Sequence, residues 1–185
     1  RLSQFNPRGS DVPVVLDLMI HDIDIILSLV NSPVESIDAN GVAVVSDSAD
    51  IANARIKFVN GCVANVTASR ISQRKMRKMR LFQRDAYISI DFSEGTAEVF
   101  RLVDADSDTK ATMMLGQINA GAHKRNIIYE QPEIKDVNAL KYELELFAKM
   151  IRGGGVPIVT AEDGKRALEV AHDIIERIRD QKVQF

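Results

Sequence analysis

The stretch Asp50-Ile-Ala-Asn-Ala-Arg-Ile-Lys-Phe-Val-Asn-Gly-Cys-Val-Ala-Asn-Val-Thr-Ala-Ser69 decides the fold of this chain. Apolar and polar residues alternate on both sides of Asn60-Gly61, a dipeptide typical of the two-residue turn of a β-hairpin. A turn this short can join only antiparallel neighbours, because parallel strands need a long crossover. The segment therefore predicts an antiparallel pair of strands at its centre.

Strand-like and helical segments extend outward from this hairpin. Further strands are expected at 34–45, 76–83, 86–91, 96–103 and 127–129, and residues 104–126 are expected to be loop-like. Helices are expected at 14–30, 138–152 and 160–179, the last one beginning with a capping-box-like pair, Thr160 and Asp163. This order predicts an α+β domain, with a largely antiparallel sheet of about six strands and helices packed on one face. Since few helices are available, we expect the open face of the sheet to be used in dimerisation.

The composition is that of a globular domain with a core of its own. The chain has 185 residues, of which 45% are hydrophobic and 27% charged, so we expect one domain spanning 1–185. A single cysteine excludes an internal disulfide and a multi-cysteine metal site, and it fits a cytoplasmic protein. The longest apolar run, 12–30, is interrupted by charged residues, which argues against a membrane span. Because the chain begins abruptly at Arg1, we expect a fragment whose N-terminal part is missing.

Asp17, His21, Asp24 and Ser28 recur at helical spacing within the apolar segment 14–30. This spacing places them on one face of a helix whose other side chains are almost all apolar. A carboxylate one turn before a histidine can orient the imidazole and stabilise its protonated form. Asp17 and His21 are therefore a candidate acid/base pair for a hydroxyl or carbonyl group.

Structural roles explain the same spacing. A satisfied buried pair, or a solvated stripe on a surface helix, would look alike in sequence, and spacing alone favours these roles over catalysis. Aspartate and histidine four residues apart can also bind zinc, but no third ligand is evident, so no metal site is predicted.

A basic segment, Arg74-Lys-Met-Arg-Lys-Met-Arg80 with Arg84 beyond it, is the second candidate feature. One face of such a strand could meet the phosphate of a ligand. A charged edge strand that resists aggregation is the better-supported interpretation. Nucleic acid is not an expected partner, because the net charge is −2 and no aromatic platform interleaves with the basic residues.

Four segments, in order, resemble the glucose-fructose oxidoreductase / inositol dehydrogenase / MocA family. The motif Val15-Leu-Asp-Leu-Met-Ile-His-Asp-Ile-Asp24 is similar to the substrate-domain motif of that family. The other three are Phe58-Val-Asn-Gly61 with Ser69-Arg70, Asn138 with Glu143-Leu-Glu-Leu-Phe147, and Pro157-Ile-Val-Thr-Ala-Glu-Asp-Gly164. Together with Phe5-Asn-Pro-Arg8, the first motif is most similar to the branch of UDP-N-acetylglucosamine 3-dehydrogenases.

The resemblance implies the C-terminal substrate and oligomerisation domain of an NAD(P)-dependent oxidoreductase that acts on a sugar or sugar-nucleotide hydroxyl. It implies that His21 takes the hydroxyl proton, that Asp17 orients the ring, and that Arg8, Arg70 and Asp24 contact the substrate. The family's Rossmann domain, which binds most of the NAD or NADP, has no counterpart here, since no G-x-G-x-x-G follows a strand. The chain alone is therefore expected to be inactive, and no residue of it is predicted to bind the cofactor.

A different class of function requires the same sheet but no catalytic residues. In that alternative the chain is a non-catalytic α+β module for dimerisation or partner binding. With the enzyme we expect a sugar or nucleotide-sugar substrate as a partner, and a homodimer or higher homo-oligomer formed through the sheet.

Overall fold

The computed structural model describes residues 1–7, 11–105, 113–120, 123–134, 138–153, 155 and 157–181. The chain forms two compact units. The first comprises residues 1–75 and 143–185, and the second comprises residues 76–142.

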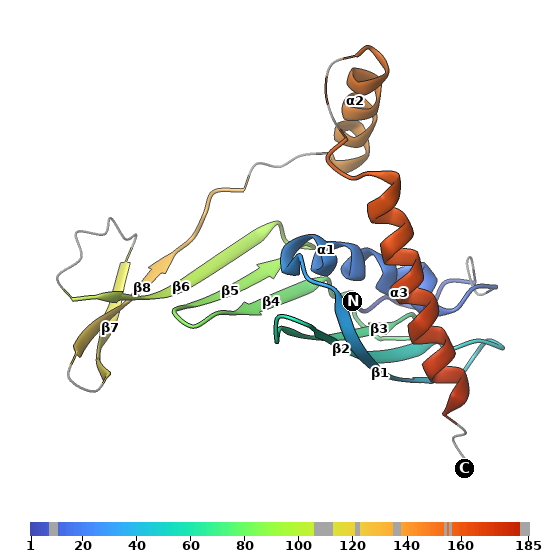
Figure 1. Cartoon of the computed structure of the whole chain (residues 1–185), viewed down its shortest axis with the longest axis horizontal. Coiled ribbons are helices and arrows are strands. Elements are labelled where there is room, and N and C mark those ends of the chain that lie inside the picture. The colour runs from blue at the N-terminus through green and yellow to red at the C-terminus, as the bar shows by residue number, and fades with distance from the viewer. Residues whose placement is uncertain are drawn as a thin grey trace. The chain divides into compact units, whose positions relative to one another are not determined.

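The first unit is a three-stranded antiparallel sheet covered by helices. Its elements are η1 (Val15–Met19), α1 (Ile20–Val30), β1 (Val34–Val42), β2 (Ile51–Phe58), β3 (Val63–Ser69) and α3 (Ala161–Asp180), with the sheet order β1-β2-β3. Helices α1 and α3 lie on one face of this sheet (Figure 1), which confirms the α+β class and the one-sided helical layer. The Asn60-Gly61 turn joins β2 to β3 as predicted, with Gly61 at φ 85°.

The core of this unit lies between the sheet and the two helices. Alternate residues of β2 face inward, and Ala52, Ala54, Ile56 and Phe58 are all buried. They pack in one cluster with Met19 and Ile23 from the first helix and with Ala171 and Ile174 from α3. The residues between them on β2 are exposed, so the far face of this sheet is polar. Burial of one strand face fixes the register of the whole sheet.

The first helix departs from the regular α-helix expected over 14–30. Residues Val15–Met19 form a π-helical turn, and α-helical hydrogen bonding begins at Ile20. The helix ends at Asn31, which adopts the left-handed conformation at φ 46°. Short π-helical turns are rare and occur often at functional sites.

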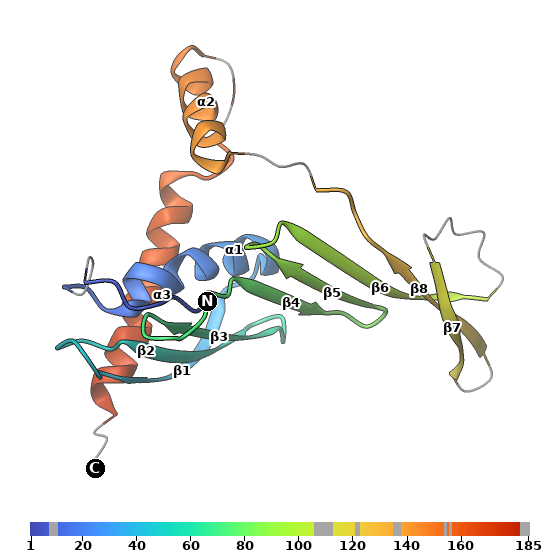
Figure 2. The same cartoon turned by 180° about the vertical axis from the view of Figure 1, so that it is seen from behind.

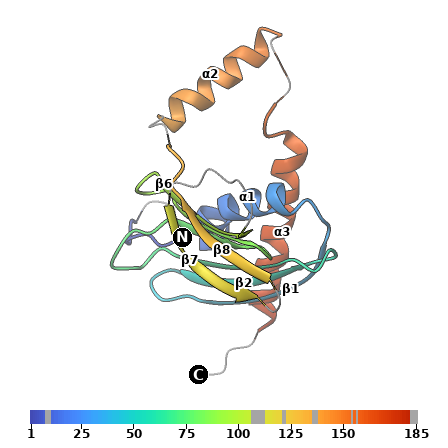
Figure 3. The ribbon, with the colours of Figure 1, turned by 90° about the vertical axis from the view of Figure 1, so that its left-hand side faces the viewer.

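The second unit is a five-stranded antiparallel sheet. Its strands are β4 (Lys78–Phe82), β5 (Ala86–Asp91), β6 (Thr96–Asp104), β7 (Met113–Ala120) and β8 (His123–Glu130), in the order β4-β5-β6-β8-β7 (Figure 2). The expectation of a loop over 104–126 is wrong for residues 113–120 and 123–126, because β7 and β8 pair along their length (Figure 3). The expected single sheet of about six strands is thus divided into two sheets.

Helix α2 comprises Ala139–Ile151, and the boundary between the two units falls within its sequence, after Tyr142. None of its described side chains is buried. At the start of α3, Thr160 Oγ1 accepts a hydrogen bond from Asp163 N at 3.2 Å, and Thr160 N donates to Asp163 Oδ2 at 2.9 Å. This capping box confirms the predicted start of the last helix. Among the described helices, none has the length and apolar character required to cross a membrane.

Candidate functional site

The helix formed by η1 and α1 carries the predicted acid/base pair. Asp17 lies in the middle of the π-helical turn and is half-buried, whereas His21 is the second residue of α1 and is exposed. Within the described residues, neither the Asp17 carboxylate nor the His21 imidazole has a hydrogen bond or ion pair. Both groups are therefore available to partners outside these residues, and a satisfied buried pair does not describe them.

The same helix is fixed to the rest of the unit through its other side. Met19, Ile23 and Leu27 are buried in the core. Asp22 is buried as well, and its Oδ1 lies 3.0 Å from Nη2 of Arg1. Since Asp22 and Ile23 point inward, the adjacent His21 is turned outward. Over residues 14–30 only His21, Ser28 and Leu29 are exposed, so the helix is packed on most of its surface.

Asp24 and Ser28, the other two polar residues at helical spacing with Asp17 and His21, contribute less to a site. Asp24 is half-buried and, among the described residues, has no ion pair or hydrogen bond from its side chain. Ser28 is exposed, and its hydroxyl donates to the carbonyl of Ile25 at 2.8 Å. Asp24 therefore stays a predicted substrate contact, and Ser28 is satisfied locally.

The predicted substrate residues Arg8 and Arg70 have different outcomes. Arg8 lies outside the described residues. Arg70 follows β3, and its guanidinium is buried against Asp50, with Nε 3.4 Å from Oδ1. It also donates from Nη2 to the carbonyls of Val12 and Ala49. Contact between Arg70 and substrate stays a prediction, and its described contacts are all within the chain.

Asp50 is a buried carboxylate that the sequence did not single out. Burial alone would raise its pKa, but the backbone N–H groups of Val45 and Val44, with the hydroxyl and N–H of Ser46, lower the pKa to about 2. Its Oδ2 accepts from the three N–H groups at 2.7, 2.7 and 3.1 Å. The signal that the sequence offered was an aspartate two residues after the polar run 46–48, a position typical of a side chain that closes a loop.

The basic segment 74–84 is exposed throughout its charged positions. Lys78 pairs with Asp91 at 2.9 Å, which lowers the pKa of that carboxyl group. The guanidinium of Arg77 lies 5.2 Å from the ring centroid of Phe92. Because β4 is an edge strand, these contacts fit the charged-edge interpretation. Binding of a phosphate by this segment stays a prediction.

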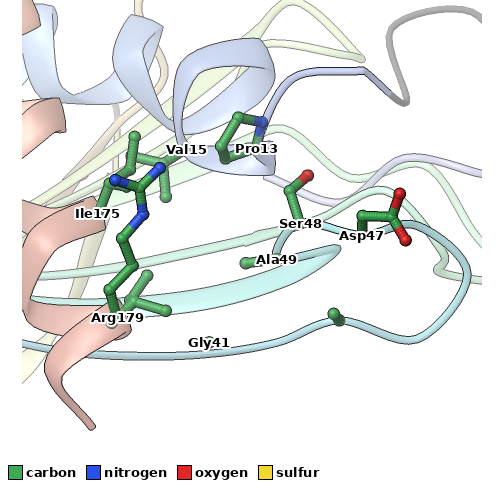
Figure 4. A pocket seen from close by; sticks show the side chains of 10 residues that line it. Pro13, Val15, Gly41, Asp47, Ser48, Ala49, Ile175 and Arg179 are labelled. Atoms are coloured by element: carbon green, nitrogen blue, oxygen red, sulfur yellow. The ribbon is translucent and has the colours of Figure 1, made fainter.

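A shallow pocket of about 260 Å³ lies between the loop after β1 and the end of α3 (Figure 4). Its lining includes Pro13, Val15, Ser48, Ile175 and Arg179, and it contains neither Asp17 nor His21. The pocket is therefore separate from the predicted acid/base pair.

Other ionisable groups offer no second site within the described residues. No three His, Cys, Asp or Glu side chains among them lie close enough to hold a metal ion. Cys62 is exposed next to the hairpin turn. His172 is exposed on α3.

Comparison with known proteins gives a consistent set of similarities. The model of the GFO/IDH/MocA C-terminal domain matches residues 4–98. A UDP-N-acetylglucosamine 3-dehydrogenase of Acidithiobacillus ferrooxidans is 44% identical over 100 residues, which are 54% of this chain and 32% of that protein. A myo-inositol 2-dehydrogenase of Thermotoga maritima is 23% identical over 175 residues, which are 91% of this chain and 48% of that protein.

Solved structures agree with these matches. The Acidithiobacillus enzyme superposes with a TM-score of 0.82 at 30% identity, covering 100% of this chain and 54% of its own. A levoglucosan dehydrogenase in complex with NADH and levoglucosan has a TM-score of 0.70 at 17% identity, covering 97% of this chain and 55% of its own, and shows the shared fold. The chain spans about half the length of these solved relatives.

Proposed function

The chain belongs to the GFO/IDH/MocA family through its C-terminal domain, and on this premise we propose that it is the substrate and oligomerisation domain of a sugar or sugar-nucleotide dehydrogenase. The observation that carries the proposal is the exposed His21, which has no hydrogen bond or ion pair among the described residues, with the Asp17 carboxylate one turn before it on a helix packed against the core. A histidine so placed can accept the proton of a substrate hydroxyl. A carboxylate beside it can orient the ring and stabilise the imidazolium.

The cofactor site is proposed to lie outside residues 1–185. Strand pairing in the described residues is antiparallel, apart from one bridge between Leu2 and Ser69. A dinucleotide cradle needs a strand, a glycine-rich turn and a helix within a parallel sheet. The described residues do not form such a cradle for NAD or NADP, so the chain by itself is expected neither to bind the cofactor nor to turn over.

The similarity to a UDP-N-acetylglucosamine 3-dehydrogenase supports a nucleotide sugar as the substrate class. A diphosphate linker would carry negative charge, and Arg74, Lys75, Arg80 and Arg84 are exposed cations without an ion pair among the described residues. Charged hydrogen bonds from arginine to phosphate oxygens are among the stronger polar contacts in proteins.

A substrate screen on the full-length protein tests this proposal. Nucleotide sugars, free sugars and cyclitols are offered with NAD and with NADP, and reduction is followed by nicotinamide absorbance. We expect turnover with a UDP-sugar and a lower kcat/KM for the same sugar without its nucleotide. Absence of turnover with every sugar and cyclitol would favour the alternative of a non-catalytic module.

Oligomerisation is proposed to use the sheet of the second unit. Phe82, Tyr87, Phe100 and Tyr129 stand opposite one another across four adjacent strands and therefore share a face. Their ring centroids are 5.0, 5.7 and 5.1 Å apart, so they form a continuous aromatic ladder. Phe82 is 79% exposed at the end of this ladder. An open aromatic face of this kind is typical of protein interfaces, and a second copy of the chain is the proposed occupant.

A further inference from the structure

We propose that the buried pair Asp50–Arg70 positions the helix that carries Asp17 and His21, an inference that rests on the function proposed for those residues. The two side chains are 0% and 4% exposed, so solvent does not weaken their attraction. They are positioning residues, because their described contacts are to the chain and not to Asp17 or His21 directly.

Arg70 contacts the chain two residues before Val14, the N-cap residue of the helix. Its Nη2 donates to the carbonyl of Val12, next to Pro13. The carbonyl of Pro13 in turn accepts hydrogen bonds from Leu16 N at 3.0 Å and Asp17 N at 3.1 Å. Arg70 thus holds the Val12 carbonyl, and the next carbonyl along the chain, that of Pro13, accepts the hydrogen bond from Asp17 N.

Asp50 holds the loop against which the same turn rests. Its carboxylate accepts hydrogen bonds from the N–H groups of residues 44–46. The carbonyl of the adjacent Ala49 accepts a hydrogen bond from Val14 N at 2.9 Å. Arg70 Nη2 reaches that Ala49 carbonyl as well, at 3.3 Å. Figure 4 shows Ser48 and Ala49 of this loop beside Pro13 and Val15 at the helix start. Loop, guanidinium and helix start therefore form one hydrogen-bonded assembly.

The helix depends on this assembly because its own start is weak. Val14, at the N-cap position, makes no side-chain capping bond, so the first N–H groups need partners elsewhere. The π-helical turn that follows is rare in isolation, and contacts from outside must hold it. Asp17 sits inside that turn, so loosening it displaces the carboxylate relative to His21. A displacement of about 1 Å in a catalytic group can lower the rate by about 10²-fold.

The test compares Arg70→Met, Arg70→Lys and Asp50→Asn in the full-length protein, with Arg55→Met as the matched control. Arg55 is an exposed arginine of β2 whose side chain, among the described residues, donates a hydrogen bond to Asn65 at 3.1 Å. The readouts are kcat and KM per folded molecule, and amide hydrogen exchange of residues 12–21. We expect Arg70→Met and Asp50→Asn to lower kcat at least about tenfold, with KM nearly unchanged. Exchange of residues 12–21 should become faster, Arg70→Lys should recover part of the loss, and the control should match wild type.

Three results would overturn the inference. A large rise in KM with kcat and exchange unchanged would make Arg70 a substrate contact. A lower melting temperature with wild-type kcat per folded molecule would make the pair a general stabiliser. Unchanged exchange of residues 12–21 in every variant that folds would remove the positioning role. If the wild-type protein shows no dehydrogenase activity, the proposed function fails, and hydrogen exchange alone still decides whether the pair fixes this helix.

Discussion

At the scale of single residues, Asp50 shows how a buried carboxylate is made acceptable. It accepts three backbone N–H groups and the hydroxyl of Ser46, and it lies beside Arg70. Hydrogen bonds to an ionised carboxylate favour the charged form and outweigh the cost of burial. The pKa of about 2, against an ordinary value of 3.8, records this balance.

The stability of the protein should therefore depend on Asp50 at low pH. Because the folded-state pKa is the lower one, the contribution is fully present above about pH 4 and is lost as the pH falls through about 2. It amounts to about 2 kcal/mol at most. Denaturant unfolding at a series of pH values measures it. Asp50→Asn should flatten the pH dependence between pH 4 and 2, and exposed Asp38→Asn on β1 should leave it in place. An unchanged slope in Asp50→Asn would contradict the assignment.

Sequence reasoning works well for residues whose role is local. The spacing of Asp17 and His21 is visible in the chain, and so is the hairpin at Asn60-Gly61. Arg70 is different, because its described partners are Asp50 and the carbonyls of Val12 and Ala49, which are distant from it in sequence. Burial of that kind depends on tertiary packing and leaves no periodic pattern.

At the scale of elements, α3 is specified by its own sequence. The Thr160–Asp163 box satisfies the first turn, and the helix buries Ala171 and Ile174 in the core. The first helix is specified less completely. Its apolar pattern predicted a helix but neither the π-helical turn nor the hydrogen bonds from Val14 N to the Ala49 carbonyl and from Asp50 N to the Val42 carbonyl. A sequence pattern of apolar residues does not encode such contacts.

Removing the cap of α3 should lower stability by a predictable amount. Thr160→Ala deletes the acceptor of the Asp163 N–H group, and loss of an N-cap typically costs about 1 kcal/mol. Denaturant unfolding gives the free energy directly. Ser28→Ala is the control, since that exposed hydroxyl donates to the nearby Ile25 carbonyl and has no other side-chain hydrogen bond within the described part of the chain. Equal free energies of unfolding for Thr160→Ala and wild type would show that the capping box does not stabilise α3.

At the scale of the whole molecule, the sequence predicted the α+β class and the antiparallel pairing. It did not predict that the strands divide into two sheets of three and five. Both sheets are built from hairpins with similar alternation, so the break between β3 and β4 has no counterpart in the pattern. The strand β7 was missed because its sequence mixes Met, Gly, Gln and Asn and contains few β-branched residues.

The aromatic ladder of the second unit makes a prediction about assembly. Phe82→Ser should weaken self-association at least about tenfold, since burying a large apolar side chain contributes about 1.5–3 kcal/mol. Sedimentation velocity over a range of concentrations measures the change. Leu29→Ser is the matched control, because Leu29 is similarly apolar and exposed but lies on α1. Equal association of both variants and wild type would place the interface elsewhere.

The proposed catalytic role of His21 is tested most directly by the kcat of the full-length dehydrogenase with His21→Ala. The comparison uses the best substrate of the screen and includes His172→Ala, which removes an exposed histidine of α3. Loss of a general base should lower kcat by about 10²–10⁴-fold in His21→Ala, while His172→Ala keeps the wild-type value. A kcat within a few-fold of wild type in His21→Ala would contradict the account.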